Sequence, residues 1–379
     1  MSEEFISAYE IIRRELKDFA CTDPNAPDLV WDVESWCIPV ESHHFPAPSL
    51  VPFVLNKVCG FSFGNPGDKT HWVVPFKYQS VPCAISLEKS GIFLYVSEEQ
   101  KNYVNPSVII DKLRKAIKEA ERKILAKIAR EQVDTANITV VNQFNHFQST
   151  YAYFRQRAAA SYKLGKIKNS TDIRAWENLS LYFRANSEGS CNSLAMIDTF
   201  FSRLEHFFVL ALAFSSFDRE GDRISTFVGS VWSEKWKRVL PLTNGKSQYF
   251  YTKLVEVKEK YRNTFAHGGF EKKGASFYFH LPEIGAIPVS MSGFRDSVHF
   301  GLFPIGEDVY QDICGLLDDF DSWLKDEALP IAWQFAESSL NLRFDQEYIN
   351  QLHAVSDTKE AFKVWLERER YHEDMHSFN

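Results

Sequence analysis

The chain has 379 residues, of which 45% are hydrophobic and 25% charged, a composition that excludes a disordered or fibrous protein. Its length exceeds the roughly 100–200 residues of a typical domain, so we expect two domains. The net charge of −7 argues against nucleic acid as a partner of the chain as a whole, but residues 101–130, 151–184 and 235–274 are basic. These segments either attract a phosphate-bearing ligand or are solvated helix faces.

The cysteines and the apolar runs indicate where the protein resides. Six cysteines are scattered along the chain without a Cys-x-x-Cys pair, so they predict neither a metal site nor a disulfide framework. The N-terminal residues do not resemble a signal peptide, and no apolar run reaches the roughly 18 residues that suggest a membrane span. We therefore expect a cytoplasmic protein with reduced thiols, no membrane partner, no bound metal and no organic cofactor.

The first hundred residues predict a small domain that contains strands. Residues 4–19 have a helical pattern, which Pro24 and Pro27 end. Apolar runs rich in β-branched and aromatic residues then alternate with turn signals. The predicted strands are 28–40, 49–55, 71–79, 83–87 and 91–97. We assign residues 1–104 to an N-terminal mixed α/β-strand domain.

A long basic helix follows this domain. Asn105 and Pro106 are typical of a helix start, and the next residues place apolar side chains at helical spacing among many Lys and Arg. We predict that residues 105–135 form a helix that connects the two halves of the chain.

The second half is predicted to be mainly helical. The expected helices are 142–162, 176–183, 190–217, 248–266 and 307–325, and strands or a hairpin are expected within 275–303. We assign residues 136–345 to this helical domain and residues 346–379 to an acidic helical tail. The predicted fold class is α+β, an N-terminal mixed domain followed by a helical bundle with a β-hairpin insertion.

One segment combines residues that carry chemistry. Residues 258–269 read KEKYRNTFAHGG and contain Arg262, Asn263 and His267. An apolar stripe predicts which side of this helix is buried, and its members are Phe250, Leu254, Val257, Tyr261 and Phe265. At about 100° per residue, the three polar residues point away from the stripe, whereas a histidine in the core would lie on it. Arg370 and His376 have a similar spacing, but they lie near the end of the chain, where fraying is expected.

The signature of the HEPN superfamily is an arginine followed directly by a polar residue and, after four to six residues in all, by a histidine. Residues of about 190–325 resemble this superfamily. The resemblance implies a compact helical bundle. It also implies a metal-independent ribonuclease that acts as a homodimer in toxin or antiphage systems, and RNA products with a 2′,3′-cyclic phosphate and a 5′-hydroxyl. HEPN proteins commonly carry an acidic residue on a preceding helix near the arginine, and Glu205 is the best-placed candidate. Alternatively, Glu205 is a surface acid that pairs with Arg203 or His206.

The residue types suit RNA cleavage. RNA carries its own nucleophile, the 2′-hydroxyl, so catalysis needs a group that moves protons near neutral pH and a cation for the charge that develops on the phosphate. His267 and Arg262 supply these functions. The lysines nearby are candidates for RNA binding, and they are Lys253, Lys258, Lys260, Lys272 and Lys273.

Two functions are therefore in view. The first is a HEPN-type endoribonuclease with Arg262, His267, Asn263 and Glu205 as its catalytic residues, RNA as its substrate, and a second copy of the chain and a cognate antitoxin or sensor protein as its partners. The second is a catalytically inert HEPN module that binds RNA, nucleotide or a protein partner. The presence of both Arg262 and His267 favours the enzyme.

Overall fold

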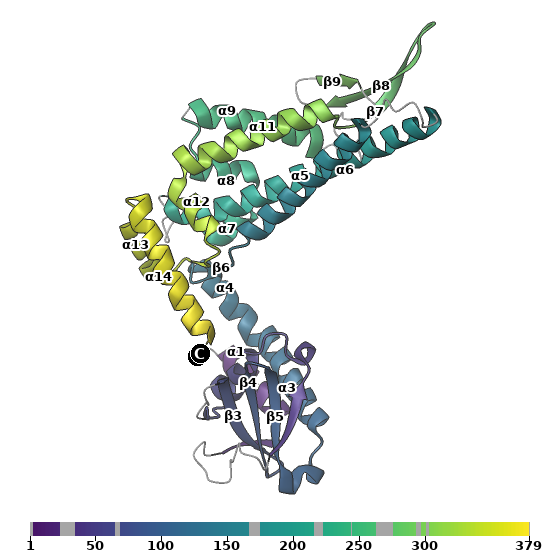
Figure 1. Ribbon diagram of the computed structural model, residues 1–379. Coiled ribbons are helices and arrows are strands. Elements are labelled where there is room, and N and C mark those ends of the chain that lie inside the picture. The colour runs from purple at the N-terminus through teal and green to yellow at the C-terminus, as the bar shows by residue number, and fades with distance from the viewer. Residues whose placement is uncertain are drawn as a thin grey trace. The chain divides into compact units, whose positions relative to one another are not determined.

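The computed structural model describes residues 3–22, 35–64, 69–166, 175–215, 223–243, 245–262, 276–292, 297–300 and 303–378. The chain forms two compact units, one of residues 1–133 and 371–379 and one of residues 134–370 (Figure 1). The first unit holds an antiparallel sheet with helices, and the second is mainly helical. The predicted α+β class is confirmed.

The first unit contains both helices and strands. In chain order they are α1 Glu3–Glu15, β1 Phe19–Cys21, β2 Ser35–Val40, η1 Ser42–His44, α2 Leu50–Pro52, η2 Phe53–Val58, β3 Thr70–Tyr78, β4 Val81–Glu88, β5 Gly91–Ser97, η3 Glu98–Tyr103, α3 Pro106–Ala120, η4 Glu121–Leu125 and α4 Ala126–Asp134. The η labels denote 3-10 helices for η1 and η3 and π-helices for η2 and η4.

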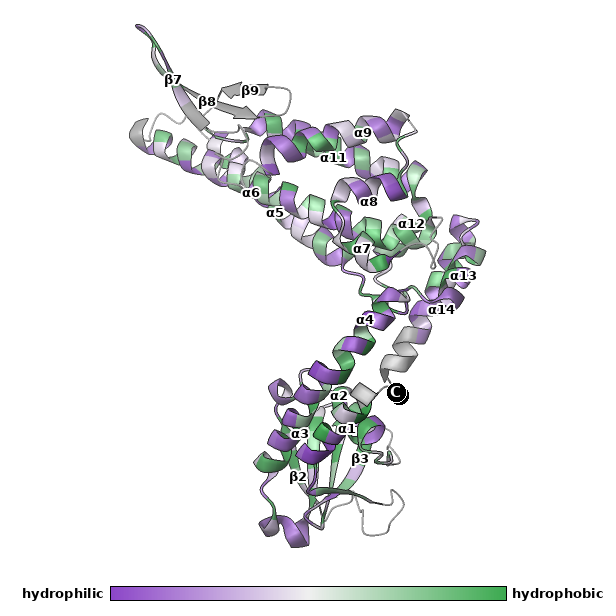
Figure 2. Ribbon diagram, turned by 180° about the vertical axis from the view of Figure 1, so that it is seen from behind, coloured by the Kyte–Doolittle hydropathy of each residue, from purple (hydrophilic) through white to green (hydrophobic). Residues whose placement is uncertain are grey.

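The sheet of the first unit packs one face against helices. Its strand order is β1-β3-β4-β5-β2, and each neighbouring pair is antiparallel. Alternate residues such as Val74 and Phe76 are buried in one core with Ile12 of α1 and Leu113 of α3, because successive strand side chains point to opposite faces. In Figure 2 the helices α3 and α4 carry both hydrophobic and hydrophilic residues, as expected of helices with one buried face.

The long basic helix is present and belongs to this core. Asn105 caps it by accepting a hydrogen bond of 3.0 Å from the backbone N–H of Ser107, and Pro106 occupies its first turn. Helical structure continues through η4 and α4 to Asp134. Because Ile109, Leu113 and Ala116 are buried in the core of the first unit, α3 is part of that unit and not only a connection.

One predicted strand is wrong. Residues 49–55 were expected to be extended, but Leu50–Pro52 and Phe53–Val58 are helical. Val51, Val54, Leu55 and Val58 are fully buried, at spacings of three, one and three residues, which is the spacing of one helix face. A short apolar run fits both a strand and a buried helix, and here the spacing of its buried members distinguishes the two.

The second unit contains most of the helices. Its elements are β6 Thr139–Val140, α5 Phe144–Lys166, α6 Ala175–Ala211, η5 Leu212–Phe214, α7 Ile224–Gly229, α8 Trp232–Val239, α9 Gly245–Val257, η6 Lys258–Arg262, β7 Ser276–Leu281, β8 Gly285–Ser292, β9 Ser297–Phe300, α11 Glu307–Trp323, η7 Leu324–Ala328, α12 Pro330–Glu337, β10 Leu342–Arg343, α13 Gln346–Val355 and α14 Lys359–Phe378, of which residues 359–370 belong to this unit. The predicted insertion is a three-stranded antiparallel sheet of order β7-β8-β9.

Helices α5 and α6 form a long antiparallel pair (Figure 1). Two separate helices were predicted for 176–183 and 190–217, but α6 runs without a break through Gly189. A Cβ atom at Gly189 would lie 2.6 Å from the ring of Tyr162 on α5. This glycine therefore permits the two helices to approach closely and does not end a helix.

The core of the second unit is aromatic and includes one buried ion pair. Arg203 of α6 is 2% exposed and contacts both carboxylate oxygens of Asp321 on α11, at 2.6 and 2.7 Å. Its guanidinium also lies 4.9 Å from the centre of the Phe200 ring. Phe362 and Trp365 of α14 belong to the same core, so the segment predicted as an acidic tail is in part a packed element of this unit.

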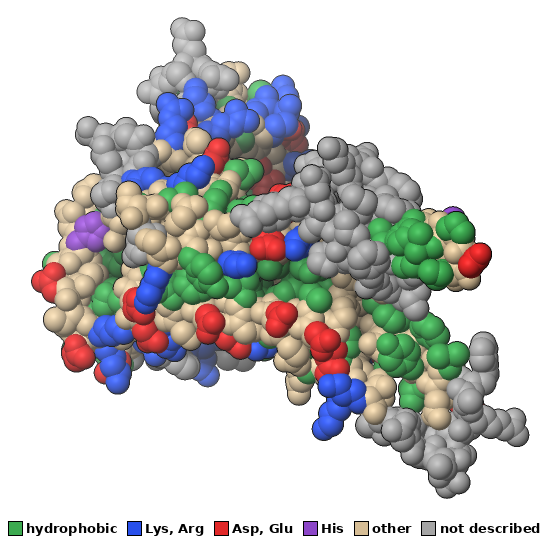
Figure 3. All heavy atoms as spheres, turned by 90° about the horizontal axis from the view of Figure 1, so that it is seen from above, with side chains coloured by type: hydrophobic (Ala, Val, Ile, Leu, Met, Phe, Trp, Pro, Cys, Tyr) green, Lys and Arg blue, Asp and Glu red, His purple; other side chains and the backbone are tan. Residues whose placement is uncertain are grey.

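On the face shown in Figure 3, several acidic side chains lie in a row, and Lys and Arg side chains lie both beside this row and in a separate group. In the part of the chain that the structure describes, no helix is long and apolar enough to cross a membrane.

Candidate active site around Arg262

The predicted apolar stripe positions Arg262. Phe250, Leu254, Val257 and Tyr261 are all buried in the core of the second unit, as the spacing predicted, and Phe265 lies outside the described residues. Arg262 is the last residue of η6, a π-helical turn that continues α9. A π-turn closes its hydrogen bonds over one more residue than an α-turn. The rotation of about 100° per residue, from which the directions of the side chains were predicted, therefore does not apply beyond Val257.

The guanidinium of Arg262 lies against α6. Its Nε donates a hydrogen bond of 2.6 Å to Asp198 Oδ1, and its Nη1 lies 3.7 Å from Glu205 Oε1. The Phe201 ring lies beneath it, with 5.6 Å between the guanidinium carbon and the ring centre. Asp198 and Glu205 are seven residues apart, which places them two turns apart on one side of α6. The Arg262 side chain is 25% exposed, so it rests on α6 and does not project freely into solvent.

Glu205 connects two cations. Its Oε2 lies 3.5 Å from Nζ of Lys235 on α8, a side chain that is only 5% exposed. Arg203 and His206, the alternative partners predicted for Glu205, have other partners. Arg203 binds Asp321, and His206 Nε2 accepts a hydrogen bond of 3.0 Å from the backbone N–H of Gln143. A buried lysine needs a counter-charge, and Glu205 supplies it while it also faces Arg262.

Lys258 is the unexpected member of this site. Its Nζ lies 5.0 Å from the centre of the Trp232 ring and 5.7 Å from that of Phe201, the ring that also contacts Arg262. Burial, and then the positive charge of Arg262, lower the pKa of Lys258 to about 8, against an opposing effect of Glu205. The sequence predicted an RNA-binding surface lysine, and it contained no signal for this aromatic environment.

The other predicted site residues divide into two groups. Lys253 and Lys260 both pair with Glu256, at 3.7 and 2.7 Å. Asn263, His267, Lys272 and Lys273 lie outside the described residues. The structure therefore brings together Arg262, Glu205 and Lys258 of the predicted set.

The comparisons with known proteins found no relative of this chain. No family model, curated protein or solved structure gives a significant match to this chain. The resemblance to HEPN proteins therefore stays a prediction that rests on Arg262, Asn263 and His267 in the sequence.

We call Asp198, Glu205, Lys235, Lys258 and Arg262 the Arg262 cluster. Sequence reasoning missed Asp198 and Lys235 in this cluster. Asp198 could have been found from its spacing of seven residues to Glu205, but Lys235 is on a different helix and gives no such signal.

The cluster contains three cations and two carboxylates, and two of the cations contact aromatic rings. Partial burial strengthens the attraction of such a positive excess for an anion. Within the described ranges, no three His, Cys, Asp or Glu side chains group closely enough to hold a metal ion.

Proposed function

We propose that this protein is a HEPN-type endoribonuclease that cleaves RNA through the 2′-hydroxyl without a metal ion, as a toxin or antiphage effector. One observation carries the proposal: Arg262, the arginine of the motif, lies within ion-pair distance of Asp198 and Glu205 on the facing helix. An acidic residue near the arginine is what the HEPN resemblance implied for Glu205. A second cation, Lys258, over the same Phe201 ring makes this location more favourable for a phosphate.

The proposed reaction transfers the phosphate between two oxygens of the RNA. His267 accepts the proton of the 2′-hydroxyl, the 2′-oxygen forms a bond to phosphorus, and the bond from phosphorus to the 5′-oxygen breaks. The leaving 5′-oxygen takes up a proton, which gives a 5′-hydroxyl and a 2′,3′-cyclic phosphate. Arg262 stabilises the negative charge on the non-bridging oxygens as the transition state forms.

The two carboxylates prepare Arg262 for this role. Asp198 fixes the guanidinium through Nε, the one donor that hydrogen-bonds to a described residue, and a guanidinium has five N–H donors in all. The remaining donors form the planar fork that suits two phosphate oxygens. Holding the fork in place before the substrate binds reduces the reorganisation needed in the transition state.

The test is cleavage of total and defined RNAs by the wild type and by Arg262→Ala and His267→Ala. We expect each variant to lose roughly a hundredfold or more of the activity, the scale of a lost general acid-base group or a lost oxyanion donor. Cleavage should persist in EDTA and yield cyclic-phosphate ends, and DNA should stay intact because it lacks the 2′-hydroxyl. The matched controls are Arg157→Ala and His280→Ala, which remove exposed residues of the same types elsewhere in this unit.

Two results would count against the proposal. Equal cleavage by the wild type and both motif variants would remove Arg262 and His267 from the mechanism. Absence of cleavage by the wild type, together with tight binding of RNA, nucleotide or a protein partner, would favour the inert HEPN module. Circular dichroism of each variant checks that its helical content is preserved.

A further inference from the structure

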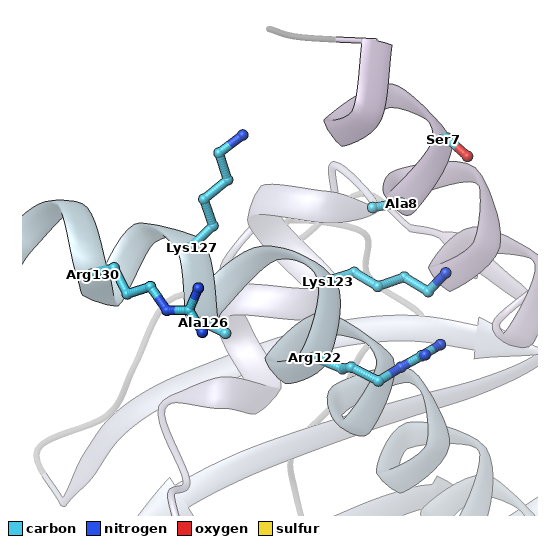
Figure 4. A pocket seen from close by; sticks show the side chains of 7 residues that line it. All are labelled: Ser7, Ala8, Arg122, Lys123, Ala126, Lys127 and Arg130. Atoms are coloured by element: carbon cyan, nitrogen blue, oxygen red, sulfur yellow. The ribbon is translucent and has the colours of Figure 1, made fainter.

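A basic groove lies within the first unit, apart from the Arg262 cluster. It runs between α1 and the helix formed by η4 and α4, and its volume is about 630 Å³ (Figure 4). Its lining residues are Ser7, Ala8, Arg122, Lys123, Ala126, Lys127 and Arg130. This volume falls in the range of about 300–1,000 Å³ that is typical of ligand sites.

The described residues of the lining include four cations and no acidic side chain. Glu119, on the preceding turn, contacts two of them, with 2.8 Å to Arg122 Nη2 and 3.9 Å to Lys123 Nζ. The charged side chains of the described lining are therefore all basic, which makes the groove electropositive on its inner surface. A concave surface lined by one sign of charge concentrates ligands of the opposite sign.

The cations form a row along the helix. Arg122 and Arg130 are eight residues apart, which corresponds to about 12 Å along a helix axis, and Figure 4 shows the basic side chains arising from successive turns. A single phosphate cannot contact both ends of such a row. Ala8 and Ala126 are small, so they leave space between the two helices for a ligand backbone.

We propose that this groove binds the sugar-phosphate backbone of a single nucleic-acid strand through Arg122, Lys123, Lys127 and Arg130. Among the described residues that line the groove, none has an aromatic side chain on which a base could stack. The groove therefore contacts the phosphates of the strand and not its bases. RNA and DNA strands should bind with about equal affinity, and the affinity should depend little on base sequence. The inference rests on the proposed function only in taking nucleic acid as the ligand.

The experiment measures binding of a fluorescent single-stranded DNA 20-mer to the full chain by anisotropy at several salt concentrations. Single-stranded DNA reports binding alone, because the proposed reaction leaves it intact. The test variant is Lys127→Ala with Arg130→Ala. The matched control is Lys115→Ala with Lys118→Ala, which removes two exposed lysines from α3 outside the groove lining.

We expect the groove variant to bind the DNA at least about tenfold more weakly than the wild type. The affinity of the control should remain within about threefold of the wild type. The salt slope of the groove variant should fall by about 1.4, since each phosphate contact on a single strand contributes about 0.7. An RNA 20-mer and a DNA 20-mer of the same sequence should bind the Arg262→Ala variant with about equal affinity.

Three outcomes would overturn the inference: no binding by the wild type, equal weakening in both double variants, or competition by pyrophosphate as effective as that by the oligonucleotide. The last would indicate a small-anion site. Failure of the proposed function looks different, because the wild type would then bind strands through the groove but leave RNA uncut. RNA cleavage by the wild type, with full affinity in the groove variant, would refute only the groove.

Discussion

Lys258 shows how its surroundings change the chemistry of a single side chain. A lysine over two aromatic rings gains some cation-π attraction but loses hydration, and the nearby guanidinium of Arg262 repels its charge. The balance lowers the pKa of Lys258 to about 8 from an ordinary 10.5. Its charge therefore changes in a pH range where a surface lysine keeps its proton.

This shift predicts a dependence of stability on pH. Between pH 8 and 10.5 the unfolded chain binds more protons at Lys258 than the folded chain does, so the free energy of unfolding should rise with pH across this window. Below about pH 8 the penalty of the charged lysine is constant. We expect the difference in unfolding free energy between wild type and Lys258→Met to increase in favour of the wild type from pH 8 to pH 10, as measured by urea denaturation.

The control for this measurement is Lys253→Met, which removes a lysine charge from the preceding helix α9, where the side chain is 47% exposed. It separates the effect of Lys258 from the loss of one positive charge in general. A difference between wild type and Lys258→Met that stays flat from pH 7 to pH 10 would contradict the lowered pKa.

At the scale of elements, the pairing of α5 with α6 determines where the site residues lie. Both Asp198 and Glu205 are on α6, and the same helix inserts Arg203 into the core. Tyr162 of α5 donates a hydrogen bond of 2.8 Å to the backbone carbonyl of Ile305 and packs on Gly189. The close approach at Gly189 thus contributes to the alignment of α6 against its neighbours.

Gly189→Ala should therefore destabilise the second unit, although alanine is the better helix former. The added methyl group would lie 2.6 Å from the Tyr162 ring, and overpacking of this kind costs about 1–3 kcal/mol. Gly315→Ala in α11 is the matched control, because nothing lies within 4 Å of its added Cβ. That change should stabilise by about 0.5–1 kcal/mol.

Thermal unfolding followed by circular dichroism measures both changes. The two variants should shift the melting temperature in opposite directions. If Gly189→Ala melts at or above the wild-type temperature, Tyr162 can move aside and the packing role of Gly189 is refuted.

At the scale of the whole molecule, the proposed enzyme is expected to act as a homodimer. The side chain of Asp198 is 62% exposed, so the Arg262 cluster reaches the surface of the second unit. A two-fold axis near this surface would bring two copies of residues 262–267 together, since the same patch faces itself in such an interface.

We expect sedimentation velocity to show a dimer at micromolar concentration, and RNA cleavage per mole of chain to fall on dilution as the dimer dissociates. Arg262 would lie at the expected interface, so Arg262→Lys serves as a control for its charge. This variant keeps the positive charge at the interface but loses the planar fork of the guanidinium. A strict monomer that retains full activity at micromolar concentration would exclude the dimeric site.

The sequence alone determined the features that depend on local patterns. Apolar spacing predicted the buried residues of α9, turn and capping residues predicted the start of α3 at Pro106, and alternation predicted the strands β3, β4 and β5. It also predicted Arg262 and, through the family resemblance, Glu205 as catalytic residues, and the two side chains lie within ion-pair distance of each other. Each of these depends on residues a few positions apart, whose geometry the backbone period fixes.

Only the tertiary structure decided which groups surround Arg262. Asp198, Lys235 and Lys258 come from three different elements, and their meeting depends on how α6, α8 and η6 pack. The packing role of Gly189 depends on Tyr162, 27 residues earlier in the chain. Long-range packing sets burial and counter-charges, and these fix the pKa of Lys258 and the orientation of Arg262.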